Sequence, residues 1–368
     1  MKRIALVNPF VPHYREEFYL RLGERYDLDI YVYDSNKSDS DAFNLRSFPV
    51  KQLKAGSFLK KRFVAYDPRP FLSPKYDAIV LMLNFGHLST WLLLLLNLFS
   101  KKRVILWGQG ISVKRYTAEM AKPSLLLRLM IQMSDGVWIY TEPEARMWRK
   151  RFPGKPIVAV NNTISGVADI LHYESGLSKQ TLKKQFGINE EICFIFCARF
   201  NNPFRRIDLL LEAIARLDSS TYGFIIIGAG GLKPDFSNFH NVHDFGAVYD
   251  ENLKAQLFAL ADIYFQPGWI GLSVVEAMAY GKPILTFRRS QNTFQCVEYH
   301  YIADGVNGYL LDDIDDFLKR VYHTPQERWI AMGNASKRRV SENLLMEHMV
   351  SRAAQVLDNL AGSRPIED

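Results

Sequence analysis

The second half of the chain contains a strand, a glycine-containing turn and a helix start in direct succession. Residues 261–265 form an apolar run that predicts a buried strand, and the helix opens at Gly271, Leu272 and Ser273. Backbone amides at a helix start have no partner within the helix and, together with the helix dipole, favour a phosphate. Glu276 follows one turn later, where its carboxylate can accept hydrogen bonds from ribose hydroxyls. This succession predicts a site for a nucleoside diphosphate.

A second loop carries three arginines. Arg199, Arg205 and Arg206 follow the apolar run 192–198, which predicts another buried strand. Cations this close together are costly unless they face solvent or an anion, and guanidinium groups bind phosphate through paired hydrogen bonds. A solvated basic loop is the alternative. We expect Arg199 and Arg205 to bind a diphosphate, and Arg206 to contribute to the same site.

Alternating strands and helices must position these loops. In the first half, apolar runs predict strands at residues 3–8, 28–33, 78–83, 103–106, 136–140 and 157–161. In the second half they predict strands at residues 192–198, 223–227, 263–265 and 283–287. Helical segments separate most of these runs, so each half is predicted to be an α/β unit with a parallel sheet. Ligands bind such sheets at the carboxyl ends of the strands.

The chain length fits two domains. With 368 residues, of which 48% are hydrophobic and 23% charged, the chain is globular and long enough for two cores. The polar stretch 162–178 predicts an irregular linker between them. We therefore expect domains at residues 1–165 and 166–345. No G-x-G-x-x-G follows the first predicted strand, which argues against a dinucleotide-dependent oxidoreductase.

Both loops also resemble motifs of a known family. The donor-site motif of the GT-B retaining glycosyltransferases of family 4, E-G-F-G-L-x-x-x-E-A-M-A, is matched by Gly271, Leu272, Glu276, Ala277, Met278 and Ala279. Their pattern G-R-L-x-x-x-K-G-x-D-x-L-L-x-A is matched, with one extra loop residue, by Arg199, Asp208, Leu210, Leu211 and Ala213. The chain is thus similar to these enzymes, and to those that build bacterial surface polysaccharides. The resemblance implies an α/β GT-B fold, in which two Rossmann-like domains face each other across a cleft.

The resemblance also implies a role for each domain. Residues 1–165 would bind the acceptor and residues 166–345 the nucleotide-sugar donor, while a helix within residues 346–368 would return to the first domain. In the family, the arginine and lysine equivalent to Arg199 and Arg205 grip the donor diphosphate. The nucleotide base packs against the segment that corresponds to Val248.

Two positions near the donor sugar depart from the family pattern. The first motif glutamate falls on Gly268, and the histidine of a W-G-H-G sequence is replaced by Gln109. Glutamine cannot act as a general acid or base, but it can hydrogen-bond a sugar hydroxyl. We expect a changed donor sugar, with loss of catalysis as the alternative.

A third loop, after the first predicted strand, carries candidates for acceptor binding. Relatives that modify lipid-linked saccharides have a P-x-Y-R sequence here, matched by a proline followed by His13, Tyr14 and Arg15. Arg15 can pair with an acceptor phosphate and Tyr14 can stack on a sugar. The alternative is that Arg15 only pairs with a neighbouring glutamate.

Charge is unevenly distributed along the chain. Residues 1–165 contain 26 Lys and Arg against 14 Asp and Glu, a net charge of +12, whereas the remainder has 20 against 25, a net charge of −5. A basic half suggests an anionic partner. Residues 58–63 interleave apolar and basic side chains, and residues 124–133 are apolar with one arginine, so both segments could lie in a lipid interface. Solvated lysines and an ordinary core helix are the alternatives.

Several classes of protein are disfavoured. The basic residues lack interleaved stacking aromatics, which argues against nucleic-acid binding. The start MKRIALVNPF has no cleavage pattern, and no apolar run approaches the ~20 residues of a membrane span. Three cysteines at 193, 197 and 296 give no disulfide framework, and no metal-ligand cluster stands out. We expect a metal-independent protein without a cofactor, in the cytoplasm at the inner face of the plasma membrane.

These observations lead to one expected function and two alternatives. The expected function is retaining transfer of a sugar from a UDP- or GDP-sugar to a glycan acceptor, lipid-linked and destined for O-antigen, capsule or exopolysaccharide. One alternative is a non-catalytic subunit of the same fold that binds nucleotide or glycan. The other is a sugar-nucleotide epimerase or hydrolase.

Overall fold

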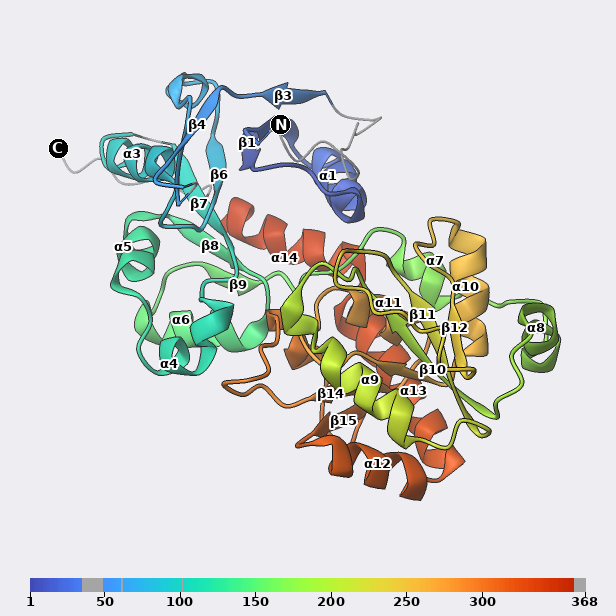
Figure 1. Ribbon diagram of the computed structural model, residues 1–368. Coiled ribbons are helices and arrows are strands. Elements are labelled where there is room, and N and C mark those ends of the chain that lie inside the picture. Colours follow the sequence, from blue (N-terminus) through green and yellow to red (C-terminus); the bar gives the residue numbers. More distant parts are fainter. Residues whose placement is uncertain (35–48, 61, 101, 361–368) are drawn as a thin grey trace. The chain divides into compact units, whose positions relative to one another are not determined.

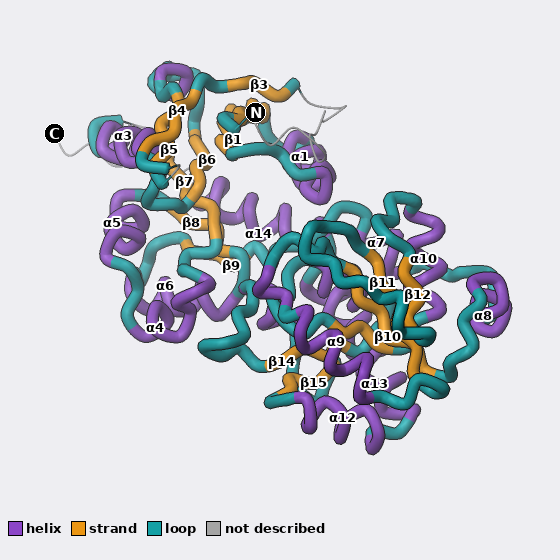
Figure 2. The backbone as a smooth tube through the Cα atoms, in the orientation of Figure 1, coloured by secondary structure: helices purple, strands orange, loops and turns teal. Residues whose placement is uncertain are grey.

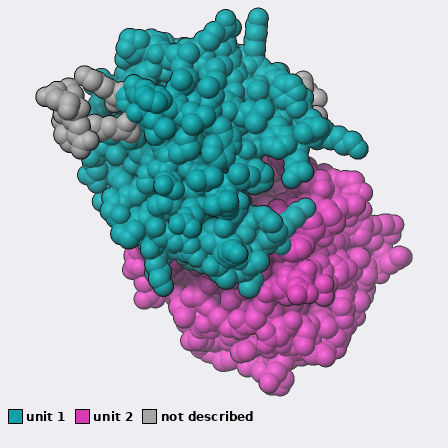
Figure 3. Space-filling view, turned by 90° about the vertical axis from the view of Figure 1, so that its left-hand side faces the viewer, with its two compact units in different colours: residues 1–165, 346–368 teal, residues 166–345 magenta. Residues whose placement is uncertain are grey.

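The computed structural model describes residues 1–34, 49–60, 62–100 and 102–360. The chain divides into two compact units: unit 1 consists of residues 1–165 and 346–368, and unit 2 of residues 166–345 (Figures 1 and 3). Each unit is built on its own sheet, and each is described separately below.

A parallel sheet of seven strands forms the centre of unit 1 within the described residues, in the order β3-β2-β1-β6-β7-β8-β9. The strands are β1 (Arg3–Asn8), β2 (Asp27–Val32), β3 (Val50–Gln52), β6 (Ala78–Met82), β7 (Arg103–Gly108), β8 (Gly136–Ile139) and β9 (Ile157–Ala159). An antiparallel hairpin, β4 (Ala55–Phe58) and β5 (Phe63–Tyr66), lies outside this sheet. Long apolar runs produce these strands because both faces of a parallel sheet are buried.

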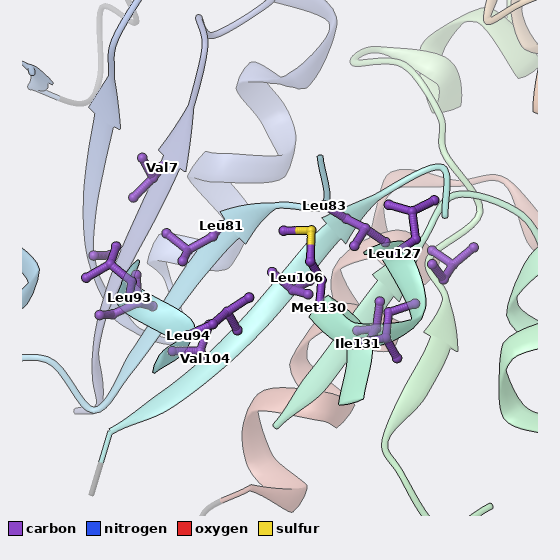
Figure 4. Packing of buried hydrophobic residues seen from close by; sticks show 14 of the residues in the cluster. Val7, Leu81, Leu83, Leu93, Leu94, Val104, Leu106, Leu127, Met130 and Ile131 are labelled. Carbon is purple, nitrogen blue, oxygen red and sulfur yellow. The ribbon is translucent and has the colours of Figure 1, made fainter. Parts of the chain in front are cut away.

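Helices cover both faces of the unit 1 sheet. They are α1 (Glu16–Gly23), α3 (Leu88–Asn97), α4 (Tyr116–Ala121), α5 (Leu125–Met133), α6 (Glu142–Arg151) and α14 (Met346–Asn359), with 3₁₀ turns η1 (His13–Arg15), η3 (Arg69–Phe71) and η4 (Val113–Arg115). Successive residues of β1 face opposite sides of the sheet. Ala5 and Val7 pack with α3, α5 and α6, and Ile4 and Leu6 pack with α1 and α14. Figure 4 shows Val7 together with core residues of α3 and α5.

Unit 2 repeats the plan with a six-stranded parallel sheet within the described residues, in the order β12-β11-β10-β13-β14-β15. Its strands are β10 (Ile192–Cys197), β11 (Tyr222–Ile227), β12 (Val242–Asp244), β13 (Ile263–Phe265), β14 (Ile284–Phe287) and β15 (Gly308–Leu311). Its helices are α7 (Val167–Leu171), α8 (Lys179–Phe186), α9 (Ile207–Arg216), α10 (Glu251–Leu260), α11 (Ser273–Ala279), α12 (Ile314–His323) and α13 (Gln326–Asn343), with 3₁₀ turns η5 (Pro203–Arg205) and η6 (Val297–Tyr301). Figure 2 shows the alternation of helix and strand in both units.

The prediction of two α/β units with parallel sheets is confirmed. One local prediction is wrong: the stretch 162–178 is not irregular throughout, because it contains α7. Gly166, at φ +72°, precedes this helix, and Val167 within it is fully buried. A helix of only five residues is too short to show a periodic apolar pattern in the sequence.

Candidate functional site

Three loops of unit 2 come together at one edge of its sheet. Strands β10, β13 and β14 are parallel neighbours, so their carboxyl ends share that edge. The loop after β10 carries the arginines, the loop after β13 carries the glycine turn, and the segment 288–296 follows β14. Backbone bonds connect them: the Gly268 amide donates to the Arg205 carbonyl (3.1 Å) and the Trp269 amide to the Phe294 carbonyl (2.8 Å).

Two buried glutamines hold the turn between β13 and α11. Gln266 donates through Nε2 to the carbonyls of Gly268 (3.0 Å) and Trp269 (2.8 Å). Gln295 accepts a bond from the Ile270 amide (2.8 Å) and donates to the Phe287 carbonyl (2.7 Å). Sequence reasoning missed both, because nothing in the sequence distinguishes a glutamine that will be fully buried.

The backbone of this turn is strained. Trp269 has φ +50°, a left-handed conformation that is costly for a bulky side chain. Such strain persists only where surrounding bonds over-determine the conformation, and Gln266 supplies two of them on either side of the Trp269 peptide. The strained turn is therefore a fixed scaffold for the helix start that follows.

The amides predicted to bind phosphate are available. None of the amides of Gly271, Leu272 and Ser273 donates to another residue in the part of the chain that the structure describes. The Ser273 hydroxyl, by contrast, is occupied, because it accepts from the Tyr264 hydroxyl (2.9 Å) and donates to Gln266 Oε1 (3.2 Å). Phosphate binding by these amides stays a prediction.

The two adjacent arginines of the loop after β10 have opposite environments. Arg206 adopts φ +56° and directs its guanidinium to Asp208 (2.6 Å) and the Thr293 hydroxyl (2.8 Å). Arg205 forms no hydrogen bond or ion pair through its guanidinium with any described residue, and its Nε is buried. A part-buried cation without a carboxylate is costly, so this position suits an anion. The role of Arg206 in donor binding stays a prediction.

The lowered pKa of Arg205 is consistent with a guanidinium that has no carboxylate partner among the described residues. Burial lowers the pKa of Arg205, and the positive charge of Arg199 acts in the same direction. Arg199 itself lies exposed just after β10.

The loop after β10 is positioned by a glycine. Gly230 has φ +148°, and a Cβ there would lie 2.5 Å from the Phe200 carbonyl oxygen. Only glycine lets these two backbones approach so closely.

Glu276 is held by a lysine that the sequence did not reveal as its partner. Lys254 Nζ lies 2.6 Å from Glu276 Oε1, and both side chains are largely buried. Because Lys254 lies on α10, only the folded structure brings Lys254 and Glu276 together. Burial, followed by the charge of Glu276, raises the pKa of the nearby Cys197 thiol to about 12, so this thiol stays protonated. Ribose binding by Glu276 stays a prediction.

The structure gives a physical reason for the missing motif glutamate. A Cβ at Gly268 would lie 2.5 Å from the Phe204 carbonyl oxygen, so no side chain fits here without a backbone shift. Phe204 packs against both Trp269 (5.2 Å between ring centroids) and Phe294 (5.0 Å). An aromatic cluster therefore borders the turn at the motif's first position.

In unit 1, the predicted acceptor residues lie in η1 after β1. Arg15 is only 6% exposed, lies 4.3 Å from the centroid of the Trp107 ring, and donates to Asn162 Oδ1 (3.0 Å). No carboxylate among the described residues pairs with it, so the alternative of pairing with a neighbouring glutamate is not observed. His13 is exposed and Tyr14 is half-buried.

The remaining predicted residues are accessible. Gln109 is half-buried just after β7 of unit 1, and Val248 is half-buried after β12 of unit 2. Their roles toward the sugar and the base stay predictions. Within the described residues, no group of three His, Cys, Asp or Glu side chains is arranged to hold a metal ion. No helix in those parts of the chain is long and apolar enough to cross a membrane.

Comparisons with known proteins agree with this architecture. Residues 191–324 match a family model described as Glycosyl transferases group 1. No curated protein sequence matches the chain significantly. The match covers most of the unit that carries the candidate donor site, and it supports a glycosyltransferase.

Solved structures share the fold over nearly the whole chain. The Anabaena protein HepE in complex with UDP superposes with a TM-score of 0.66 at 14% identity, covering 98% of this chain and 100% of HepE. The lipopolysaccharide outer core galactosyltransferase WaaB gives 0.66 at 13% identity, covering 97% and 99%. A TarM variant of S. aureus in complex with UDP and glycan ligands gives 0.62 at 12% identity, covering 97% and 100%. The predicted fold class, GT-B with two Rossmann-like units, is confirmed.

Proposed function

We propose that this protein transfers a sugar from a nucleoside diphosphate sugar to a glycan acceptor. The observation that carries the proposal is Arg205, a guanidinium with a buried Nε and no partner among the described residues. It lies on the loop whose backbone is bonded to the turn that ends at the free amides of residues 271–273. A part-buried positive charge on a loop bonded to a turn with unpaired amides suits a diphosphate.

In this proposal, stabilisation of the leaving group is the main catalytic contribution. Negative charge develops on the β-phosphate as its bond to the sugar breaks, and Arg199, Arg205 and the helix-start amides stabilise that charge. Preorganised donors are effective here because Gln266 and Gln295 fix the turn before the donor binds. Retention of configuration is proposed from the family resemblance alone.

The donor is proposed to be a UDP- or GDP-sugar. The HepE and TarM structures contain UDP, which favours uridine as the first base to test. Glu276, fixed by Lys254, would accept the ribose hydroxyls, and Val248 would contact the base. Gln109 would hydrogen-bond the sugar, and the absence of a side chain at Gly268 would alter the choice of sugar. No metal is assigned a role, because guanidinium and amide groups supply the positive charge.

The acceptor is proposed to be a lipid-linked glycan in bacterial surface polysaccharide synthesis. Arg15 supports this, because its cation has aromatic neighbours and an amide but no carboxylate partner among the described residues. Such a group suits an acceptor phosphate, with Tyr14 beside it for a sugar ring. The protein would then work in the cytoplasm, at the inner face of the plasma membrane.

Binding and turnover test the proposal separately. Calorimetry with UDP, GDP and their common sugar conjugates should show one tight nucleotide diphosphate, and Arg205→Met should weaken it. The conjugate that binds is then incubated with a lipid extract of the source organism, and transfer is followed by mass spectrometry of the lipids. No binding of any diphosphate would refute the donor site. Binding without transfer would favour the non-catalytic alternative, and a new sugar nucleotide or free sugar without acceptor would favour the epimerase or hydrolase.

A further inference from the structure

Helix α3 has apolar side chains on both its inner and its outer face. Leu93 and Leu94 are buried in the core beneath it (Figure 4). The outer face exposes Leu88, Leu92, Leu95 and Leu96, each by 42% to 51%, and Phe99 just beyond the helix is 93% exposed. A helix at the surface of a soluble protein normally carries polar residues on its outer face. The outer face of α3 therefore lacks the pattern of a water-facing surface.

Neighbouring elements extend this apolar surface. Helix α5 contacts α3 and buries Leu127, Met130 and Ile131, while it exposes Leu125 (66%), Leu126 (45%) and Leu129 (39%). Helix α3 also contacts β5, and the β4–β5 hairpin exposes Phe58 (53%) and Leu59 (74%). We call these exposed side chains of α3, α5 and the hairpin the α3–α5 face. Exposed apolar side chains gathered on elements that contact one another indicate an interaction site.

Basic side chains occur on two of the elements that form the α3–α5 face, the hairpin and α5, and on the segments that flank α5 in the sequence. Exposed cations from the hairpin, from η4 and the end of α4, and from α5 and α6 are Lys54, Lys60, Arg62, Lys114, Arg115, Lys122, Arg128, Arg146 and Lys150. Residues 101–155 alone contain 12 Lys and Arg against 4 Asp and Glu, a net charge of +8. This part of unit 1 therefore combines exposed apolar side chains with an excess of cations.

A pocket between α4 and α6 repeats this combination on a smaller scale. Its apolar lining comes from Met120, Pro143 and Met147, and its cations come from Arg146, Lys150 and Arg151. Helix α5, which carries part of the α3–α5 face, begins four residues after α4 ends. Figure 1 draws α4, α5 and α6 near one another in unit 1. Apolar walls beneath a cluster of cations fit the headgroup and upper chain of an anionic lipid.

We propose that the α3–α5 face docks onto an anionic lipid bilayer. The leucines of α3 and α5 enter the interfacial region, and the lysines and arginines of this part of unit 1 contact lipid phosphates. Charge favours this occupant over a second copy of the chain, because two such faces placed together would bring the cations of the hairpin and of α5 in one copy close to those in the other. The proposal builds on the proposed lipid-linked acceptor, but the face would bind lipid whether or not transfer occurs.

Flotation with vesicles tests the proposal. Wild-type protein should float with vesicles of phosphatidylcholine and phosphatidylglycerol, and much less with phosphatidylcholine alone. The variant Leu92→Gln/Leu95→Gln/Leu129→Gln should reduce the partition coefficient by about fivefold for each half-exposed leucine, on the order of a hundredfold in total. A matched control, Leu177→Gln/Leu232→Gln/Ile330→Gln, changes side chains of unit 2 with 41% to 55% exposure and should float like the wild type.

A second variant separates charge from apolar burial. Lys122→Gln/Arg128→Gln/Lys150→Gln should reduce binding to the anionic vesicles and leave the weak binding to phosphatidylcholine unchanged. Wild-type protein that does not float, or a leucine variant that floats like the wild type, would overturn the proposal. A leucine variant that only converts a dimer to a monomer in light scattering would assign the face to self-association instead. Nucleotide calorimetry on the same samples keeps a failure of the donor site distinct from a failure of docking.

Discussion

Replacing Arg205 by methionine should have opposite effects on stability and on donor binding. Without ligand, Arg205 has a buried Nε that makes no hydrogen bond with any described residue. An unsatisfied buried donor costs about 1–3 kcal/mol, and methionine fills a similar volume without that cost. We therefore expect Arg205→Met to raise the free energy of unfolding of the ligand-free protein by about 1–2 kcal/mol.

Donor binding should change in the other direction. A hydrogen bond from a guanidinium to a phosphate contributes about 1.5–3 kcal/mol, and Arg205 can supply two of them. Loss of the pair should weaken nucleoside diphosphate binding by roughly a hundredfold or more, since each 1.4 kcal/mol corresponds to a factor of ten. Arg205→Lys, which keeps the charge but loses the paired geometry, should fall between the wild type and the methionine variant.

Urea unfolding and titration calorimetry on the same preparations measure the two effects. Arg216→Met is the matched control, because Arg216 lies in α9, pairs with Asp315 and Glu212, and is not part of the site. It should leave nucleotide affinity unchanged and unfolding nearly so. An Arg205→Met protein that is less stable than the wild type, or that binds the diphosphate equally well, would refute the argument from an unpaired cation.

Four further predictions follow from individual contacts. Glu276→Gln should weaken nucleotide binding by about 1–2 kcal/mol in calorimetry while the unfolding midpoint changes little, whereas equal affinity would remove Glu276 from the ribose site. Gly268→Ala should destabilise the fold by about 1–3 kcal/mol in urea, because the new Cβ meets a backbone oxygen at 2.5 Å. Burial lowers the pKa of Lys282 to about 8 in the folded protein, against ~10.4 in the unfolded chain. Between pH 8 and this unfolded pKa the unfolded state binds more protons than the folded state, so the free energy of unfolding of the wild type should rise with pH across this window. Lys282→Met should lack that rise and be more stable at pH 7 by up to about 3 kcal/mol; a parallel pH profile would contradict the burial argument. Burial also lowers the pKa of His87 to about 4, so stability should fall as the pH drops from ~6.5 toward that value, and His87→Gln should remove the loss in thermal unfolding scans.

Much of the fold could be predicted because buried parallel strands correspond to continuous apolar runs in the sequence. The runs at residues 3–8 and 192–198 coincide with β1 and β10 almost residue for residue, since both faces of each strand must be apolar. The β4–β5 hairpin was not predicted, because its first strand is exposed throughout and shows no alternation. Helix α7 was missed because one turn of helix has no detectable period.

The candidate site could be predicted only in its residue types. The sequence placed three arginines on one loop and a phosphate-type turn on another, because these patterns depend on neighbours along the chain. It could not tell Arg205 from Arg206, which are adjacent and chemically identical. Their difference comes from a left-handed backbone at Arg206 and from the approach of Thr293, 87 residues later in the chain.

The sequence by itself determined two α/β units, the loops that carry charge, and the basic character of the first half, because burial periodicity and composition are local properties. Tertiary structure alone decided which groups are left without partners. Gln266 and Gln295 form hydrogen bonds to the turn, and Lys254 forms an ion pair with Glu276. Arg205 has no such partner among the described residues. The same holds for the leucines of α3, since a continuous apolar helix does not say which of its faces will be covered. A partner is a relation between distant segments, so it exists only once the chain has folded.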